Sequence, residues 1–297
     1  MTENKIGIFI TQYSLFLYML FVPDWKNTCF IYQVENARIN LCIKHKMKQC
    51  GVKNTINSIE EVFERKEKYN DKEKYIVYGQ DHATIAPLFF WYRFICIEDG
   101  TANYLAQPVV FTKGLENEPV FPYGISRYIQ KIYLTGRLEI KNEEVKKKAV
   151  LFDIKECWDR KTQDEKLEIM WIFGFDYNKF MEIVRKGRNV ILLTQDFYPR
   201  YLTEQAQIHI YQELLKDIDL RSVVIKPHPE DKICYEKYFP GCMVIRDNFP
   251  FELLYLTEVP FRRVITVNST SAYGLEKWDG VEIETHEEVL HNTYAGT

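Results

Sequence analysis

Apolar runs of roughly four to eight residues, rich in Val, Ile, Phe and Tyr, recur along the chain with helical stretches between them. This alternation is typical of parallel β-sheets, because a parallel strand can follow its neighbour only after a crossover, which is usually a helix. The predicted strands lie at 6–10, 28–33, 75–78, 94–97, 131–134, 189–193, 222–225, 242–246 and 263–267. The predicted helices lie at 13–22, 58–68, 83–91, 163–173, 205–216 and 251–258. The sequence therefore predicts an α/β fold with parallel sheets.

The chain has 297 residues, which favours two domains at roughly 150 residues each. Residues 139–186 have a helical, highly charged pattern, and a new apolar strand begins after Gly187. We expect a first domain at 1–186, with a helical linker at about 139–186, and a second domain at 187–297. The chain contains no GxGxxG and no GxxxxGK[ST] motif, so neither a dinucleotide fingerprint nor a P-loop is supported. Two Rossmann-like domains without these motifs are found in GT-B glycosyltransferases, where a nucleotide-sugar lies in the cleft between the domains.

Charge and cysteine content argue against several classes of protein. Lys and Arg number 39 against 42 Asp and Glu, a net charge of −3, so no positive excess exists to neutralise the phosphates of a nucleic acid. Seven cysteines are scattered along the chain without a CxxC pair. This argues against a disulfide framework or a zinc knuckle and favours a cytoplasmic protein with reduced thiols.

The apolar segment at 6–22 approaches the length of a membrane span. Polar residues at 11–14 divide it, Pro23 ends it, and the residues before it lack the basic region of a signal peptide. We interpret the segment as a buried strand followed by a buried helix. Peripheral association with the inner face of the cell membrane stays open.

Two adjacent acids follow the predicted strand 94–97, where Glu98 and Asp99 precede Gly100. In open α/β sheets the carboxyl ends of the strands face the ligand crevice. An acid at that position can act as a general base. The alternative is an ordinary Asp-Gly turn after a strand.

The segment Lys226-Pro227-His228-Pro229 follows the predicted strand 222–225. The two prolines restrict the backbone on both sides of His228. A stiffened imidazole beside an ammonium group is suited to hold a phosphate and to protonate it as it departs. A turn histidine that caps the next helix is an equally good interpretation.

A hydroxyl-rich segment follows the predicted strand 263–267 and precedes a predicted helix start; it comprises Asn268, Ser269, Thr270 and Ser271. Ser and Thr cap helices, and together with the N–H groups of a helix start they form an anion site. Two weaker candidates are Thr194-Gln195, after the strand 189–193, and Glu252. Glu252 is either a helix-start acid favoured by the helix dipole or an acceptor for the hydroxyls of a ribose.

The ordered set EDG at 98–100, KPHP at 226–229 and NSTS at 268–271 resembles the bacterial sialyltransferases that carry a D/E-D/E-G motif, an HP motif and a serine-rich motif. Within these the chain is most similar to glycosyltransferase family 52, the lipooligosaccharide and capsule sialyltransferases, over about residues 5–280. The supporting segments are VYGQDH at 77–82, ILLTQ at 191–195 and PFELL at 250–254. The chain is short for this family, and Glu is an allowed variant at the first acid position, not the commonest residue.

The resemblance implies an inverting transferase with a GT-B fold that takes CMP-Neu5Ac as donor, needs no metal or other cofactor, and acts on a terminal galactose hydroxyl of a cell-surface glycan. It makes Asp99 the general base, supported by Glu98 and Gly100 of the same motif. It makes His228 the group that binds and protonates the leaving phosphate. It further implies nucleotide contacts from Thr194, Gln195, Lys226, Pro229, Glu252, Asn268, Ser269, Thr270 and Ser271. Dimerisation through the linker helices is also implied.

An HP motif that binds a CMP phosphate does not define the sugar, so a CMP-Kdo transferase or a polysialyltransferase is an alternative. A non-catalytic nucleotide-binding protein is a third interpretation. His286 and His291 resemble a zinc-binding HExxH motif but are five residues apart where that motif requires four, so we expect no metal site there. His82 is either part of the site or merely a helix-start residue.

Overall fold

The computed structural model describes residues 4–32, 39, 41–64, 73–105, 112–113, 119–275 and 277–289. The chain divides into two compact units, Met1–Phe173 and Gly174–Thr297, so the division falls before α8 (Tyr177–Arg185) and not near 186. Phe175 and Phe180 explain this position, because their rings stack at 5.2 Å and both meet the ring of Phe249 edge-on. Helix α8 therefore belongs to the core of the second unit.

The first unit is built on a seven-stranded sheet in the order β3-β2-β1-β4-β5-β8-β9, in which every neighbouring pair is parallel. Its strands are β1 (Asn4–Phe9), β2 (Cys29–Tyr32), β3 (Thr55–Ile56), β4 (Tyr75–Gly79), β5 (Arg93–Ile97), β8 (Ile129–Leu134) and β9 (Ala149–Leu151). A short antiparallel pair is formed by β6 (Thr112–Lys113) and β7 (Pro119–Val120). Since the seven strands run the same way, their carboxyl ends lie along one edge of the sheet.

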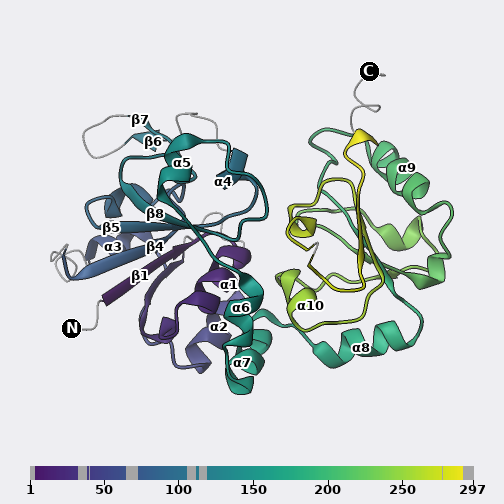
Figure 1. The fold of residues 1–297 in the computed structure, drawn as a ribbon, viewed down its shortest axis with the longest axis horizontal. Helices are drawn as coiled ribbons and strands as arrows, with labels where there is room; N and C mark the ends of the chain where they lie inside the picture. The colour runs from purple at the N-terminus through teal and green to yellow at the C-terminus, as the bar shows by residue number, and fades with distance from the viewer. Residues whose placement is uncertain are drawn as a thin grey trace. The chain divides into compact units, whose positions relative to one another are not determined.

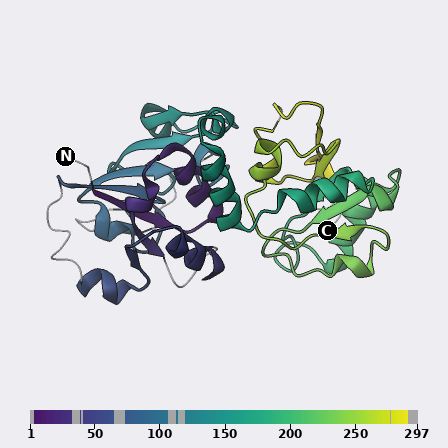
Figure 2. The same ribbon diagram turned by 90° about the horizontal axis from the view of Figure 1, so that it is seen from below.

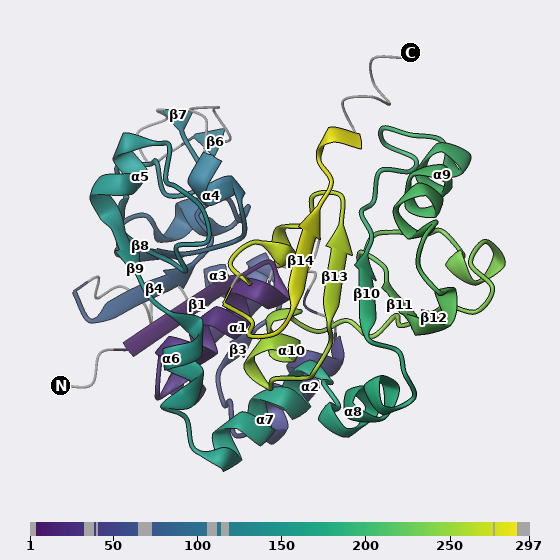
Figure 3. The ribbon, with the colours of Figure 1, turned by 45° about the vertical axis from the view of Figure 1, so that its right-hand side comes forward.

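The second unit has a five-stranded parallel sheet in the order β12-β11-β10-β13-β14. Figure 3 shows the arrows of β10, β13 and β14 running in the same direction. The strands are β10 (Val190–Leu193), β11 (Val223–Lys226), β12 (Met243–Val244), β13 (Arg263–Thr266) and β14 (Glu282–Thr285). The expected α/β class with two Rossmann-like units is confirmed.

Helices cover the sheets, as expected from parallel strands with helical crossovers. In the first unit they are α1 (Gln12–Phe21), α2 (Leu41–Gln49), α3 (Ile59–Glu64), α4 (Ala102–Leu105), α5 (Glu143–Lys148), α6 (Ile154–Asp159) and α7 (Gln163–Phe173). Helices α1, α2, α6 and α7 gather on one side of the sheet (Figures 1 and 2), and the rings of Phe16 and Phe173 join α1 to α7 at 5.7 Å. The second unit adds α9 (Glu204–Leu215) and α10 (Glu252–Leu256) to α8.

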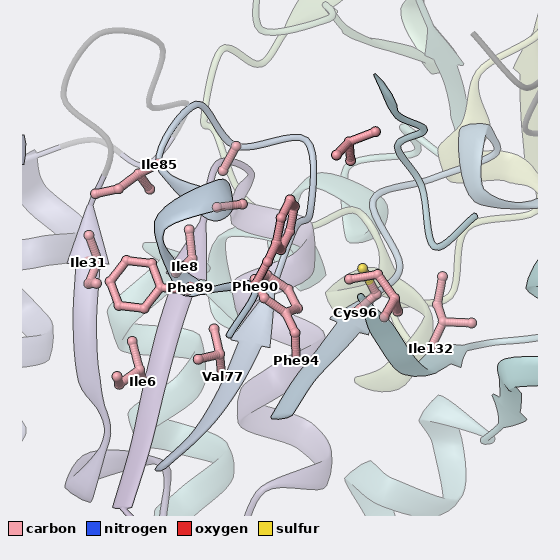
Figure 4. Packing of buried hydrophobic residues seen from close by; sticks show 14 of the residues in the cluster. Ile6, Ile8, Ile31, Val77, Ile85, Phe89, Phe90, Phe94, Cys96 and Ile132 are labelled. Carbon is pink, nitrogen blue, oxygen red and sulfur yellow. The ribbon is translucent and has the colours of Figure 1, made fainter. Parts of the chain in front are cut away.

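The predicted helix at 83–91 is wrong: a 3₁₀ helix at Ala86–Phe89 and flanking turns occupy this segment. Pro87 cannot donate a helical hydrogen bond, and Phe89 and Phe90 are buried in the core cluster over the sheet. Figure 4 shows the Phe89 ring near Ile8 and Ile31 and the Phe90 ring beside Phe94, whose ring centroid is 5.8 Å from that of Phe90. Packing of the two aromatic rings therefore determines the path of this segment.

Other predicted elements are confirmed with different bounds. The predicted helix 58–68 is described only as α3, since residues 65–72 lie outside the described part of the chain. The predicted strand 242–246 shortens to Met243–Val244. The helical region expected at 139–186 also contains β9, the edge strand of the first sheet.

The apolar N-terminal segment forms β1 and α1, a strand and a helix as predicted. Helix α1 is ten residues long, and eight of them are buried, namely Gln12 and the seven residues from Ser14 to Leu20. Among the described residues no helix is both long enough and apolar enough to cross a bilayer. All seven cysteines lie in the described part of the chain, and each is a thiol outside any disulfide.

Candidate active site

The EDG motif begins directly after β5, beside the end of β4. The two strands are parallel neighbours with Gly79 opposite Cys96, so residues 80–82 and 98–100 leave the sheet at the same edge. Gly79 has a φ of +143°, and a Cβ there would lie 1.9 Å from the carbonyl oxygen of Ile8. Only glycine permits this close approach, which directs Gln80 over the end of β1.

The Asp99 carboxylate is surrounded by donors and is 16% exposed. Its Oδ1 accepts hydrogen bonds from Thr11 Oγ1 at 2.9 Å and from Gln80 Nε2, while Oδ2 lies 3.1 Å from His82 Nε2. The backbone N–H of Asp99 donates to Asn103 Oδ1 at 2.7 Å, which joins the motif to α4. Both carboxylate oxygens are therefore fixed in place.

His82 is a cation in this site. Burial opposes a charge on its imidazole, but the neighbouring carboxylates of Asp81 and Asp99 outweigh burial and raise the pKa of His82 to about 9. The His82 ring also contacts the ring of Tyr123, with centroids 4.6 Å apart. At neutral pH Asp99 thus faces an imidazolium.

Glu98, the first acid of the motif, is fully buried and forms part of the protein framework. Its Oε1 pairs with Arg137 Nε at 2.7 Å and accepts from the hydroxyl groups of Tyr13 and Thr135, at 2.9 and 3.2 Å. Its Oε2 accepts from Tyr104 Oη at 2.7 Å and from the backbone N–H of Thr135 at 2.6 Å. Glu98 therefore joins α1, α4 and the segment after β8.

In the second unit, three parallel strands place the other predicted residues at one edge of the sheet. Leu193, at the end of β10, is opposite Lys226 of β11 on one side and Thr266 of β13 on the other. The segments 194–195, 227–229 and 267–271 consequently begin at the same edge. Three motifs that are far apart in the sequence therefore meet at one edge of the sheet in this unit.

Thr194 stabilises the turn that contains His228. It is 2% exposed, and its hydroxyl accepts from the backbone N–H of His228 at 3.2 Å and donates to Asp231 Oδ2 at 2.6 Å. Asp231 also accepts from Tyr235 Oη at 2.6 Å and from Gln207 Nε2 at 3.3 Å. Thr194 and Asp231 therefore hold the backbone of the His228 turn through hydrogen bonds.

The His228 side chain is 27% exposed. Its Nδ1 accepts a hydrogen bond from the backbone N–H of Glu230 at 3.2 Å, which places the proton of the neutral ring on Nε2. Asp196 Oδ1 lies 3.7 Å from the same Nδ1. The imidazole thus presents an Nε2–H donor, the group that an anionic ligand requires.

Lys226 is half-buried, and its ammonium donates to the carbonyl oxygen of Asp247 at 3.3 Å and lies 4.7 Å from the centre of the Phe249 ring. Burial lowers the pKa of Lys226 to about 8, although the charges of Asp247 and Glu252 oppose this change. Glu252 is buried in the first turn of α10. Lys226 and Glu252 are therefore electrostatic neighbours.

The hydroxyl-rich segment does not start a long helix, because a 3₁₀ helix of three residues, Thr270–Ala272, occupies this place. Ser269 is buried and caps that turn, with its hydroxyl accepting from the backbone N–H of Ser271 at 3.4 Å. The other predicted nucleotide contacts are half-buried or exposed in this unit, namely Gln195, Pro229, Asn268, Thr270 and Ser271. The predicted helix start is therefore a single 3₁₀ turn capped by Ser269, and the anion site stays a prediction.

The structure brings together two groups of predicted residues, one in each unit. Asp99 lies with Glu98 and Gly100, and His228 lies with Thr194 and Lys226. The sequence analysis left His82 undecided and missed Thr11, Gln80 and Arg137. The available signal was VYGQDH at 77–82, which follows the strand next to the one that ends in EDG.

His286 Nε2 lies 3.5 Å from Glu284 Oε2 and its Nδ1 lies 3.1 Å from Glu288 Oε1, and His291 lies outside the described residues. Within the described ranges no three His, Cys, Asp or Glu residues are grouped to hold a metal ion.

Comparison with known proteins adds a family and a fold. The model of glycosyltransferase family 52 matches residues 16–285. An uncharacterized protein of Haemophilus influenzae is 36% identical over 224 residues, which cover 73% of this chain and 72% of that protein.

Solved structures with the same fold include a 2,6-sialyltransferase from Photobacterium sp. JT-ISH-224 in a ternary complex with CMP and lactose (TM-score 0.70, 9% identity, 95% of this chain and 71% of that one). The GT-B domain of a Photobacterium damselae sialyltransferase is also similar, with a TM-score of 0.61 and 14% identity over 94% of this chain and 89% of that one. A UDP-GlcNAc 2-epimerase from Neisseria meningitidis bound to UDP-GlcNAc shares the fold as well, with a TM-score of 0.57 and 14% identity over 97% of this chain and 85% of that one. The GT-B fold expected from the sequence is thus confirmed, while the fold alone does not distinguish a transferase from an epimerase.

Proposed function

The chain belongs to glycosyltransferase family 52, and from this we propose that it is an inverting sialyltransferase. Its donor is CMP-Neu5Ac, and its acceptor is a terminal galactose hydroxyl of a lipooligosaccharide or capsule glycan. The observation that carries the proposal is the Asp99 carboxylate at the carboxyl end of β5, partly exposed and held on both oxygens. An epimerase does not need a base for an acceptor hydroxyl, so the family and this carboxylate together favour transfer.

Asp99 acts as the general base. The acceptor O–H bond breaks, its proton goes to the Asp99 carboxylate, and the oxygen forms a bond to the anomeric carbon of sialic acid. The bond from that carbon to the CMP phosphate breaks at the same time, and its electron pair stays on the phosphate oxygen. Because there is a single displacement, the configuration at the anomeric carbon inverts.

His228 stabilises the departing phosphate. Since Nδ1 already accepts from the backbone N–H of Glu230, Nε2 carries the ring proton and donates a hydrogen bond to the phosphate oxygen. Lys226, Glu252, Ser269, Thr270 and Ser271 are the proposed contacts of the nucleotide. No metal takes part, because donors aimed at the phosphate stabilise its developing charge.

We place this activity in the cytoplasm, with peripheral association at the inner membrane face and a homodimer as further parts of the proposal. A CMP-Kdo transferase or a polysialyltransferase stays the alternative within the same chemistry. Donor preference separates the CMP-Kdo transferase from the other two, and the acceptor separates a polysialyltransferase, which adds sialic acid to sialic acid.

The first test is transfer by the purified full chain from CMP-Neu5Ac to lactose in the presence of EDTA, with the product identified by mass spectrometry. Sialylated lactose is the expected product. Transfer from CMP-Kdo alone would overturn the choice of donor, and loss of transfer in EDTA that Mg²⁺ restores would contradict metal independence.

Two variants test the assigned roles. Asp99→Asn should keep the affinity for CMP and lower kcat about 10²-fold to 10⁴-fold, as expected for a general base. His228→Ala should weaken both CMP binding and turnover. Asp219→Asn is a matched control, since Asp219 is an exposed carboxylate paired with Arg221. An Asp99→Asn variant as active as this control would remove Asp99 from the mechanism.

A further inference from the structure

His82 lies between two carboxylates that the sequence places on different segments. Its Nε2 is 3.1 Å from Asp99 Oδ2, and its Nδ1 is 3.8 Å from Asp81 Oδ1. The His82 side chain is 14% exposed and the Asp81 side chain 1%. A protonated imidazole has a donor on each nitrogen, so one N–H is within hydrogen-bond distance of Asp99 and the other faces the Asp81 carboxylate at ion-pair distance.

The position of Asp81 is itself fixed. Its two oxygens accept from the backbone N–H groups of Tyr123 and Gly124, at 2.9 and 2.8 Å. Both residues have a positive φ, 63° and 91°, so the loop turns its N–H groups toward one carboxylate. The Lys148 ammonium holds the following turn by donating to the carbonyl oxygens of residues 124, 125 and 126, at 3.0, 2.9 and 2.7 Å. His82 is therefore bound to a rigid part of the unit.

We infer that the His82 imidazolium is a positioning residue for Asp99: it fixes Oδ2 of the base through a charge-assisted hydrogen bond, while Thr11 and Gln80 fix Oδ1. This inference rests on the proposed function, because it assigns a partner to the proposed base. His82 does not itself take the acceptor proton, since both ring nitrogens of a protonated imidazole already carry one.

The charge on His82 is sensitive to alkaline pH. The carboxylates of Asp81 and Asp99 and the ring of Tyr123 lie next to its ring, and Asp81 in turn interacts with the Lys148 ammonium and the Cys96 thiol. The two carboxylates raise the pKa of His82 to about 9. As pH rises through this value the ring loses its charge, but Nε2–H can still donate to Asp99. The charge-assisted hydrogen bond that holds Oδ2 then becomes a weaker, neutral one.

A direct test is an NMR titration of the imidazoles in the full chain, which has six histidines. The His82 signal is assigned by its loss in His82→Gln. We expect it to titrate at alkaline pH in the wild type and at a lower pH in Asp99→Asn. A His82 signal that titrates near the ordinary histidine value of about 6.5, or that is unmoved by Asp99→Asn, would overturn the inference whatever the activity.

The second test is the dependence of kcat/KM for lactose on pH, at saturating donor and in a Lys226→Arg background that removes the titration of Lys226. His82→Gln keeps an amide donor but no charge, so we expect its rate at neutral pH to be about tenfold to hundredfold below that of the chain with His82. The rate of the chain with His82 should fall above about pH 9, and that of His82→Gln should not. The wild-type rate should approach that of His82→Gln at high pH. His45→Gln, at an exposed histidine on α2, is the matched control and should follow the wild type.

The outcomes separate the two proposals. If Asp99→Asn abolishes transfer while His82→Gln follows the wild type at every pH, the inference fails and the proposed function stands. If His82→Gln lowers the rate by the same factor at all pH values, His82 is only structural and the inference also fails. If Asp99→Asn is fully active, the proposed base is wrong, and the role of His82 toward it is wrong as well.

Discussion

Replacing Glu98 by Gln removes one charge from the centre of the first unit without changing its shape. Glu98 is fully buried, and its partner Arg137 is 4% exposed. The acid accepts on Oε1 from Arg137 Nε and on Oε2 from the backbone N–H of Thr135. Neither of these donors can become an acceptor. Whichever way the amide of the substituted side chain is turned, its NH₂ group therefore faces a donor.

The expected loss of stability follows from the donors that Glu98→Gln leaves without an acceptor. One buried donor loses its acceptor, which costs about 1–3 kcal/mol. The Arg137 guanidinium also loses its counter-charge, and breaking a buried pair by removing one partner costs about 3–5 kcal/mol in total. We take about 3 kcal/mol as the expected loss in the free energy of unfolding of this unit. At a urea m-value of about 2 kcal/mol per M, the midpoint falls by about 1.5 M.

The assay is urea unfolding of the full chain followed by hydrogen exchange and mass spectrometry, because peptides from the two units then report separately. Glu144→Gln is the matched control, since Glu144 forms an exposed pair with Lys147 that contributes little. We expect the midpoint of the first unit to fall only in Glu98→Gln and the second unit to keep its midpoint. Equal midpoints for the two variants would refute the reasoning from buried donors.

Two further predictions concern the second unit. Thr194→Val removes the hydroxyl between His228 N–H and Asp231, so we expect faster amide exchange at 228–231 and a loss of about 1–3 kcal/mol in the free energy of unfolding. Thr194→Ser keeps the hydroxyl and should be close to wild type. Equal exchange in both variants would contradict the structural role of the hydroxyl. Because burial lowers the pKa of Lys226 to about 8, this cation is lost as pH rises, and CMP affinity measured by calorimetry should fall above about pH 8 by up to tenfold per unit. Lys226→Arg should show a flat profile over the same range, and an equal fall in both proteins would exclude Lys226 as the cause.

Most of the strands could be predicted from the sequence because most of them are short apolar runs inside a parallel sheet; β12 is an edge strand that was also predicted. The strands that the sequence did not predict are β3, β9 and β14 at sheet edges and the short antiparallel pair of β6 and β7. Residues 149–151 lie next to a charged helical segment, and 282–285 are alternately charged, so neither has the continuous apolar pattern of a strand buried on both faces. Their strand conformation comes from pairing with β8 and β13, which no local pattern indicates.

The candidate site was predictable where residues are contiguous and unpredictable where they are not. Asp99 and His228 each follow a recognisable strand within a short motif. His82 reaches Asp99 only because β4 and β5 are neighbours in the sheet, and strand order cannot be read from apolar runs. Arg137 and Tyr13 reach Glu98 from positions that differ by 39 and by 85 residues in the chain for the same reason.

The carboxylate of Asp231 beneath the His228 turn has a consequence for the energetics of ligand binding. Backbone and side-chain freedom in this turn is already lost when the unit folds, since Asp231 collects hydroxyl and amide donors from Thr194, Tyr235 and Gln207. An anion that binds His228 therefore meets a preorganised loop and bears little of the ordering entropy that a flexible loop would cost.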